Sequence, residues 1–362
     1  MDSLILCILG DIIGFENGDI KRSQPKFTKK KFGDSYFEKA LHYAHNYFLT
    51  FIINGGVNRD ISDFKYSFNT LMLFATLKGL SEGKEYKKNC SKEYINVYNK
   101  YTEKKLSEQY FPNNVYLKSL QLLAKNEVIH YDNKYNDSMV LSRIVPFGLL
   151  FWKKEDRGKL ITEIIENISL THKDNFCYFS AITLGLFISF KKNGLDAPKW
   201  GFKLVEYFLS NEFDTIIKQH KLYNTKFMLD KEDYVSIWNG YLDASFKDNQ
   251  YKQNNNVKMI YPEYRANYFF LTFNDLYANE VIYGIKAEEC IIIAYDSLLY
   301  SNGYWEKLII YGINGVTDNS VMGSVCGILF GIEHGINNSI NKNIFKNEQW
   351  LKKLLILSKN II

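Results

Sequence analysis

Residues 317–335 read T-D-N-S-V-M-G-S-V-C-G-I-L-F-G-I-E-H-G, with glycines at every fourth position, 323, 327, 331 and 335. Residues four apart share one face of an α-helix, so these glycines predict a stripe without side chains where the backbone of another helix can come close. Glycine costs roughly 0.5–1 kcal/mol per interior helix position relative to alanine, so a run in register indicates a packing requirement. The stretch therefore predicts a helical fold with close helix packing at this point.

One acidic residue precedes the glycine stripe. Asp318 stands at the expected N-terminus of the helix, where unpaired backbone N–H groups and a carboxylate could face a ligand or a metal. By itself the stripe indicates close packing alone. The acid keeps a ligand or metal site open as a second interpretation.

Length and composition restrict the class of protein. The chain has 362 residues, of which 46% are hydrophobic and 23% charged, a globular balance that suffices for one large domain or two. The net charge of +5 is mild and does not indicate a nucleic-acid partner. The five cysteines form no C-x-x-C pair, and no run approaches the roughly 20 apolar residues of a membrane helix. Because the short apolar start also lacks a basic leader, we expect a cytoplasmic monomer without membrane contact.

Apolar residues at three- and four-residue spacing predict helices along most of the chain. Only five prolines occur, and neither a long Gly/Ser linker nor an alternating strand pattern is present. We therefore expect an all-α fold with a single domain over residues 1–362. The predicted helices are Ser35–Ile53, Asn69–Leu80, Val115–Leu123, Met139–Trp152, Lys159–Leu170, Phe176–Phe190, Asp196–Ser210, Glu232–Ala244, Ala266–Tyr277, Ala287–Tyr300, Tyr304–Tyr311, Ser320–Glu333 and Asn347–Ser358.

Four further motifs place polar side chains within apolar segments: G-D-I-I-G at 10–14, S-F-N-T at 67–70, D-S-M-V-L-S-R-I-V-P-F-G at 137–148 and T-H at 171–172. Taken alone, each has a structural interpretation, such as a capped turn at Asp11, a helix N-cap at Ser67 or a hydrogen-bonding His172. A buried arginine requires a partner, so Arg143 either pairs within the protein or faces an anionic ligand. The phosphate loop, the G-x-S-x-G elbow and the H-E-x-x-H motif are all absent from the sequence.

Taken together and in order, these motifs resemble those of the ADP-ribosylglycohydrolase family, particularly the branch that hydrolyses ADP-ribosyl-arginine. The resemblance covers nearly the whole chain. The matching stretches are G-D-x-x-G at 10–14, G-G at 55–56, S-D-D-T with its A-T-x-x-x-L helix at 67–80, G-x-G-A-x-M-R-x-x-P-x-G at 137–148, T-H-x-x-P at 171–175, A-Y-D-(A/S)-(V/L)-L at 294–299, and G-G-D-(S/T)-D-(S/T) with the glycine stripe at 316–335.

The resemblance implies an all-α, orthogonal helical bundle with a central cleft. Family enzymes bind two Mg²⁺ ions there and hydrolyse the glycosidic bond between ADP-ribose and a protein side chain. Carboxylates hold the metals, which orient the ribose hydroxyls and a water molecule and stabilise the developing charge. By the same resemblance Asp11, Arg143 and His172 would bind substrate, and ADP-ribose or an ADP-ribosylated protein is the expected partner.

The chain departs from the family at the metal ligands. Ser67 keeps its hydroxyl, but Phe68 and Asn69 replace two acids. In the second motif Asp318 remains, whereas Ser320 replaces an acid. Mg²⁺ usually needs at least one or two carboxylates beside water and substrate oxygens. We therefore expect Ser67, Asn69 and Asp318 to bind one metal weakly at best, and the catalytic positions held by Phe68, Asn69 and Ser320 to be impaired.

Three functions remain open at this point. The preferred one is a pseudoenzyme, a family member whose Mg²⁺-dependent hydrolysis is lost or severely impaired. The second is an active hydrolase with a remodelled single-metal site. That site would use Asp318, Asn69, Ser67 and Asp11. The third is a non-catalytic ADP-ribose reader or interaction scaffold, in which Arg143 and His172 are the retained recognition residues of the reader.

Overall fold

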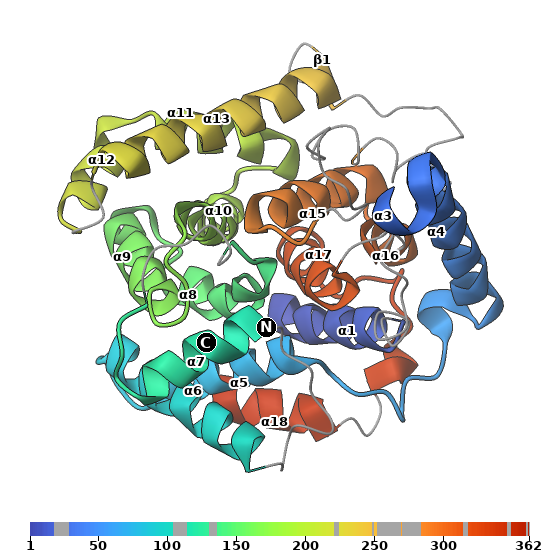
Figure 1. The fold of residues 1–362 in the computed structure, drawn as a ribbon, viewed down its shortest axis with the longest axis horizontal. Coiled ribbons are helices and arrows are strands. Elements are labelled where there is room, and N and C mark those ends of the chain that lie inside the picture. The colour runs from blue at the N-terminus through green and yellow to red at the C-terminus, as the bar shows by residue number, and fades with distance from the viewer. Residues whose placement is uncertain are drawn as a thin grey trace. The chain divides into compact units, whose positions relative to one another are not determined.

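The computed structural model describes residues 1–17, 29–103, 114–129, 136–220, 224–247, 250–251, 269, 284–313, 318–345, 349–359 and 361 (Figure 1). The chain separates into two compact units. Unit 1 comprises residues 1, 67–251 and 349–362, and unit 2 comprises residues 2–66 and 252–348. Each unit thus combines segments that are distant in sequence. The single-domain assignment stays a prediction.

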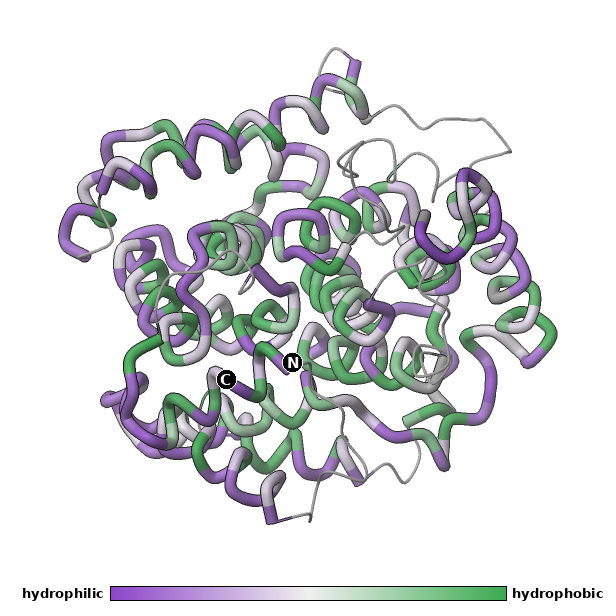
Figure 2. The backbone as a smooth tube through the Cα atoms, in the orientation of Figure 1, coloured by the Kyte–Doolittle hydropathy of each residue, from purple (hydrophilic) through white to green (hydrophobic). Residues whose placement is uncertain are grey.

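The described part of unit 2 consists of helices and the loops that join them. Its elements are α1 (Asp2–Asn17), α3 (Lys29–Phe32), η1 (Gly33–Ser35), α4 (Tyr36–Ile53), η2 (Gly56–Asn58), α15 (Ala287–Ser301), α16 (Trp305–Ile313), α17 (Asn319–Glu333) and η9 (Lys342–Phe345). Helix α17 makes its most extensive contacts with α1, and α15 and α16 pack on α17 and on each other (Figure 1). Figure 2 shows α1 and α17 as largely hydrophobic along their length, as expected for two central helices.

The glycine stripe explains how α1 and α17 approach each other. A Cβ atom added to Gly327 would lie 1.9 Å from the carbonyl oxygen of Leu6, and one added to Gly331 would lie 2.4 Å from the Cα of Ser3. From the other side, a Cβ on Gly14 of α1 would lie 2.0 Å from the carbonyl oxygen of Asn319. Backbone therefore meets backbone along an antiparallel pair, and the close packing predicted from the stripe is confirmed.

Unit 1 is built from helices and one short strand pair in its described part. Its elements are α5 (Phe68–Ser81), α6 (Tyr86–Thr102), α7 (Asn114–Ala124), η4 (Ser138–Val140), η5 (Ser142–Ile144), α8 (Val145–Leu150), η6 (Lys154–Asp156), α9 (Arg157–Ile168), α10 (Asn175–Lys192), η7 (Ala197–Lys199), α11 (Trp200–Phe208), α12 (Asn211–Lys218), α13 (Thr225–Ser245), β1 (Phe246–Lys247), β2 (Gln250–Tyr251) and α18 (Gln349–Ser358). Helix α10 packs against α8, α9 and α13, while α5 packs against α6, η5 and α18.

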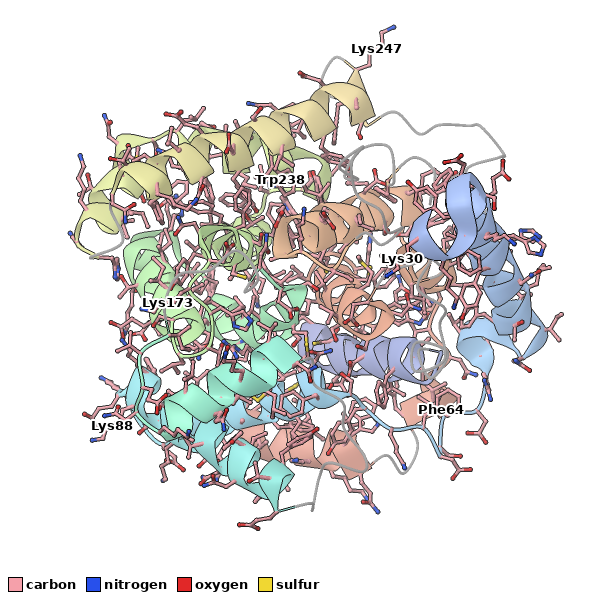
Figure 3. All side chains as sticks on the ribbon, in the orientation of Figure 1. Lys30, Phe64, Lys88, Lys173, Trp238 and Lys247 are labelled. Atoms are coloured by element: carbon pink, nitrogen blue, oxygen red, sulfur yellow. The ribbon has the colours of Figure 1, made fainter. Side chains whose placement is uncertain are left out.

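Helix α13 shows how the sequence pattern sets orientation in unit 1. Hydrophilic and hydrophobic residues alternate along it at helical spacing (Figure 2), so that one face is buried. Trp238 points inward from this helix (Figure 3), and its ring lies 5.7 Å from that of Phe187 on α10. Lys247, just after the helix, extends outward (Figure 3). The core of unit 1 is therefore aromatic at the α10–α13 contact.

The all-α prediction is confirmed, and among the described residues one short antiparallel pairing, β1 with β2, is the exception. The single helix expected over Met139–Trp152 is instead divided into η4, η5 and α8. Pro146 has no N–H to donate and lies in the first turn of α8, which starts a new helix. The helix expected over Ala266–Tyr277 lies outside the described residues except for Phe269. Within the described part of the chain, no helix combines the length and apolarity that a bilayer crossing requires.

Candidate functional site

The N-terminus of α5 carries the first of the two motifs expected to hold metal. Ser67 has extended backbone geometry, and its Oγ accepts the backbone N–H of Asn69 at 3.0 Å. Both side chains are buried. The Ser67 hydroxyl is thus the N-cap of the helix, which confirms the structural interpretation of this motif.

Phe68 occupies the position where the family motif has its first acid. Its side chain is only 1% exposed. The ring packs edge-on against Tyr101, at a centroid distance of 6.2 Å, and against Tyr116, at 5.8 Å. Such aromatic pairs contribute about 0.5–1.5 kcal/mol each beyond their buried area. An aromatic cluster therefore stands where the resemblance predicts an oxygen ligand.

Arg143, on η5, is fully buried. Its Nη1 donates to the hydroxyl of Tyr116, and its Nη2 donates to Thr171 Oγ1 at 2.6 Å and to the carbonyl oxygen of Asn167 at 3.5 Å. The guanidinium also faces the rings of Tyr94 and Tyr116, at 4.9 and 5.5 Å from their centroids. These partners are hydroxyls, a carbonyl and aromatic rings, so the buried cation is held by neutral groups and cation–π contacts.

His172 lies beside this arginine in the segment between α9 and α10. Its Nδ1 is 2.7 Å from Thr171 Oγ1, and its ring packs against that of Tyr116 at 5.1 Å. Burial, followed by the charge of Arg143, lowers the pKa of His172 well below its usual value, so the imidazole is neutral at pH 7. Its Nε2 is buried and has no hydrogen-bond partner among the described residues. The structure thus brings Arg143 and His172 together through Thr171.

The loop before Arg143 is also ordered by its own side chains. Asp137 Oδ1 accepts the backbone N–H of Met139 at 2.9 Å and so caps η4. Both residues are buried. By the resemblance they stand at glycine positions of the family motif, and here Asp137 is the N-cap of the short 3-10 turn that contains Met139.

Unit 2 carries the second metal motif at the N-terminus of α17. Asp318 is the N-cap: its Oδ1 accepts the Ser320 hydroxyl at 2.9 Å and the Val321 N–H at 3.4 Å. Ser320, which stands where an acid was expected, therefore donates to the acid that remains. Asp11, on α1, is fully buried, and its charge adds to the effect of burial in raising the pKa of Cys7.

Neither of these helix N-termini by itself offers the carboxylates that a pair of Mg²⁺ ions requires. The first motif offers a hydroxyl and an amide, and the second offers a single carboxylate that already accepts two hydrogen bonds. Mg²⁺ is a hard ion that relies on carboxylate oxygens for charge neutralisation. Across the part of the chain that the structure describes, His, Cys, Asp and Glu form no group of three that could hold a metal.

Sequence reasoning named Arg143 and His172 but missed the aromatic residues that hold them. Tyr116 touches Phe68, Arg143 and His172, and Tyr94 faces the guanidinium of Arg143. The sequence gives little indication of these tyrosines. The chain contains 27 of them, so a tyrosine on a predicted helix is not distinctive.

Comparison with known proteins agrees with this motif order. The ADP-ribosylglycohydrolase family matches residues 2–355. L444 of Acanthamoeba polyphaga mimivirus, which carries the name of an ADP-ribosyl glycohydrolase, is 25% identical over 328 residues, 87% of this chain and 60% of its own length. The ADP-ribosylhydrolase ARH1 of Dictyostelium discoideum is 23% identical over 197 residues, 50% of this chain and 49% of its own. The chain thus spans about half to three fifths of the length of these relatives. Because the family match extends over nearly all of the sequence, this protein belongs to the ADP-ribosylglycohydrolase family.

Proposed function

We propose that this protein is a family member in which the Mg²⁺-dependent hydrolysis of the ADP-ribose–protein bond is lost or severely reduced. The observation that carries the proposal is the burial of Phe68 between Tyr101 and Tyr116, at the position of the family's first ligand acid. An aromatic ring offers no oxygen to a metal.

The remaining donors support the same proposal. Asp318 is the single acid left of the four in the two motifs, and its Oδ1 caps α17. Family catalysis relies on two metals to orient water and to stabilise the charge that develops as the glycosidic bond breaks. Without the carboxylates that hold them, that stabilisation is lost.

Calorimetric titration with Mg²⁺ tests the proposal. We expect no binding to the wild-type protein up to roughly millimolar Mg²⁺, the weak end of specific divalent-cation sites. The matched variant carries Phe68→Asp, Asn69→Asp and Ser320→Asp, which restores the missing acids, and its thermal unfolding is compared with wild type to verify folding. Binding by the wild-type protein that Asp318→Ala removes would instead support the single-metal hydrolase.

A second candidate function is binding of ADP-ribose without cleavage. The buried cluster of Arg143, Thr171 and His172 favours it, because these retained residues leave the His172 Nε2 without a partner among the described residues. Thermal unfolding with and without ADP-ribose separates the possibilities. A ligand that binds only the folded protein raises its stability, so a clear upward shift supports a reader, whereas no shift leaves an interaction scaffold.

A further inference from the structure

We propose that His172 acts as a neutral hydrogen-bond donor through its Nε2–H, and that Arg143 and Thr171 are positioning residues that fix this tautomer. The inference extends the proposed binding of ADP-ribose. Its statement about the ligand rests on that proposed function, whereas its statement about the tautomer does not. It predicts that the atom facing His172 in a complex is an acceptor oxygen rather than a donor.

The first step concerns the single proton of the Thr171 hydroxyl. Thr171 Oγ1 accepts a hydrogen bond from Arg143 Nη2 at 2.6 Å, and this arginine has protons only to donate. The hydroxyl proton then needs an acceptor, and His172 Nδ1 lies 2.7 Å away. The Tyr116 hydroxyl also hydrogen-bonds Thr171. Because Tyr116 accepts from Arg143, which has no lone pair to offer, its own proton is available to the second lone pair of Thr171 Oγ1. The proton of Thr171 is therefore directed to Nδ1.

The second step is electrostatic. A neutral imidazole carries its proton on one nitrogen and a lone pair on the other. Through Thr171, Nδ1 is the ring nitrogen that faces the positive guanidinium of Arg143. A lone pair directed toward a cation is favoured over an N–H directed toward it, more strongly so in a buried site where screening is weak. Both steps place the proton on Nε2.

The third step concerns what Nε2–H meets. This nitrogen is buried, and no described residue accepts from it. Buried N–H groups without a partner are rare in folded proteins, because each costs about 1–3 kcal/mol. The nearby charge of Arg143 makes an anionic oxygen the best complement to this donor. A phosphate oxygen of a nucleoside diphosphate ligand has that chemistry.

Nitrogen NMR of protein labelled with ¹⁵N-histidine tests the tautomer directly. The two ring nitrogens of a neutral histidine have separate shifts that report which one is protonated, and the His172 signals are assigned as those missing from His172→Gln. We expect a protonated Nε2 and an unprotonated Nδ1 in the wild-type protein. A protonated Nδ1 would overturn the inference.

Substitution of Thr171 tests the positioning role. Thr171→Val keeps the shape of the side chain but removes the hydroxyl, and we expect mixed tautomers and about tenfold weaker binding of ADP-ribose, the equivalent of one hydrogen bond to a charged group. Thr171→Ser keeps the hydroxyl and should retain the wild-type tautomer and affinity, which a role in packing alone would not require. Equal ¹⁵N shifts in Thr171→Val and Thr171→Ser would contradict the positioning role, even if both variants are less stable than wild type.

Inorganic pyrophosphate and adenosine identify the part of the ligand that His172 recognises. We expect pyrophosphate to perturb the Nε2 signal, and adenosine to leave it unchanged. The reverse pattern would overturn the assignment of an anionic oxygen. If no ligand changes the spectrum of the wild-type protein, the binding of ADP-ribose fails, while the tautomer is still decided by the shifts of the free protein.

Discussion

Gly323 of α17 and Gly10 of α1 are in mutual backbone contact. A Cβ atom on Gly10 would lie 2.0 Å from the carbonyl oxygen of Gly323, and one on Gly323 would lie 2.1 Å from the carbonyl oxygen of Gly10. No side-chain rotation can relieve such a contact, because the obstructing atoms belong to the backbone. This pair therefore sets the separation of the two helices.

Gly323→Ala is expected to destabilise the protein by at least about 2 kcal/mol, since overpacking costs 1–3 kcal/mol even where neighbours can adjust. Gly240→Ala is the matched control, because a Cβ on this α13 glycine meets nothing within 4 Å. There we expect a gain of about 0.5–1 kcal/mol from helix propensity. Urea unfolding of both variants measures the difference, and equal free energies of unfolding would contradict the packing argument.

The sequence predicted this contact only in part. The glycines at 323, 327 and 331 indicate that some backbone must approach α17, but they do not identify which one, and Gly335 lies beyond the end of the helix with φ at 63°. Gly10 and Gly14 lie in a motif that sequence reasoning treated as a turn around Asp11, whereas they are the partners of the stripe. The choice of partner is a tertiary property, and it leaves no local pattern in either helix.

Whether a helix could be predicted from the sequence depended on its local pattern. Helix α6 was not predicted because most of its residues are polar, and its buried side is formed mainly by Cys90, Tyr94 and Val97. At the candidate site, the missing acids were visible in sequence, since each is a change of residue type. The hydrogen bond from Arg143 to Tyr116 was not visible in the sequence, because it joins η5 to α7, which are distant along the chain.

Arg143→Lys is expected to lower the free energy of unfolding by about 2 kcal/mol. A lysine ammonium lacks the planar fork with which Arg143 donates to Tyr116 and Thr171 and lies over the aromatic rings. A buried hydroxyl would therefore lose its hydrogen-bond partner. Arg59→Lys is the control, because Arg59 is exposed, and surface changes usually stay within about 0.5 kcal/mol. Chemical denaturation of the two variants gives the comparison, and similar losses would argue against a structural role for Arg143.

Stability is expected to fall as the pH drops below about 6.5, the ordinary pKa of histidine. The pKa of His172 is lowered in the folded protein. Below pH 6.5 the unfolded chain therefore binds a proton that the folded chain does not, and stability decreases by up to about 1.4 kcal/mol per pH unit until the folded pKa is reached. In His172→Gln this dependence should be shallower. The exposed His42 of α4 provides the control His42→Gln.

Unfolding free energies measured between pH 7 and pH 5 for the three proteins decide this prediction. Parallel curves for wild type and His172→Gln would show that His172 takes up a proton in the folded state as readily as in the unfolded one. A shallower curve for His42→Gln alone would assign the dependence to an exposed histidine instead.

The most direct test of the central claim is release of ADP-ribose from a protein modified on arginine, followed over time with Mg²⁺ and with a chelator. With Phe68 buried among aromatic rings and Asp318 as the remaining acid of the two motifs, we predict no Mg²⁺-dependent release above the uncatalysed rate. Sustained turnover that requires Mg²⁺ and is abolished by Asp318→Ala would contradict the account.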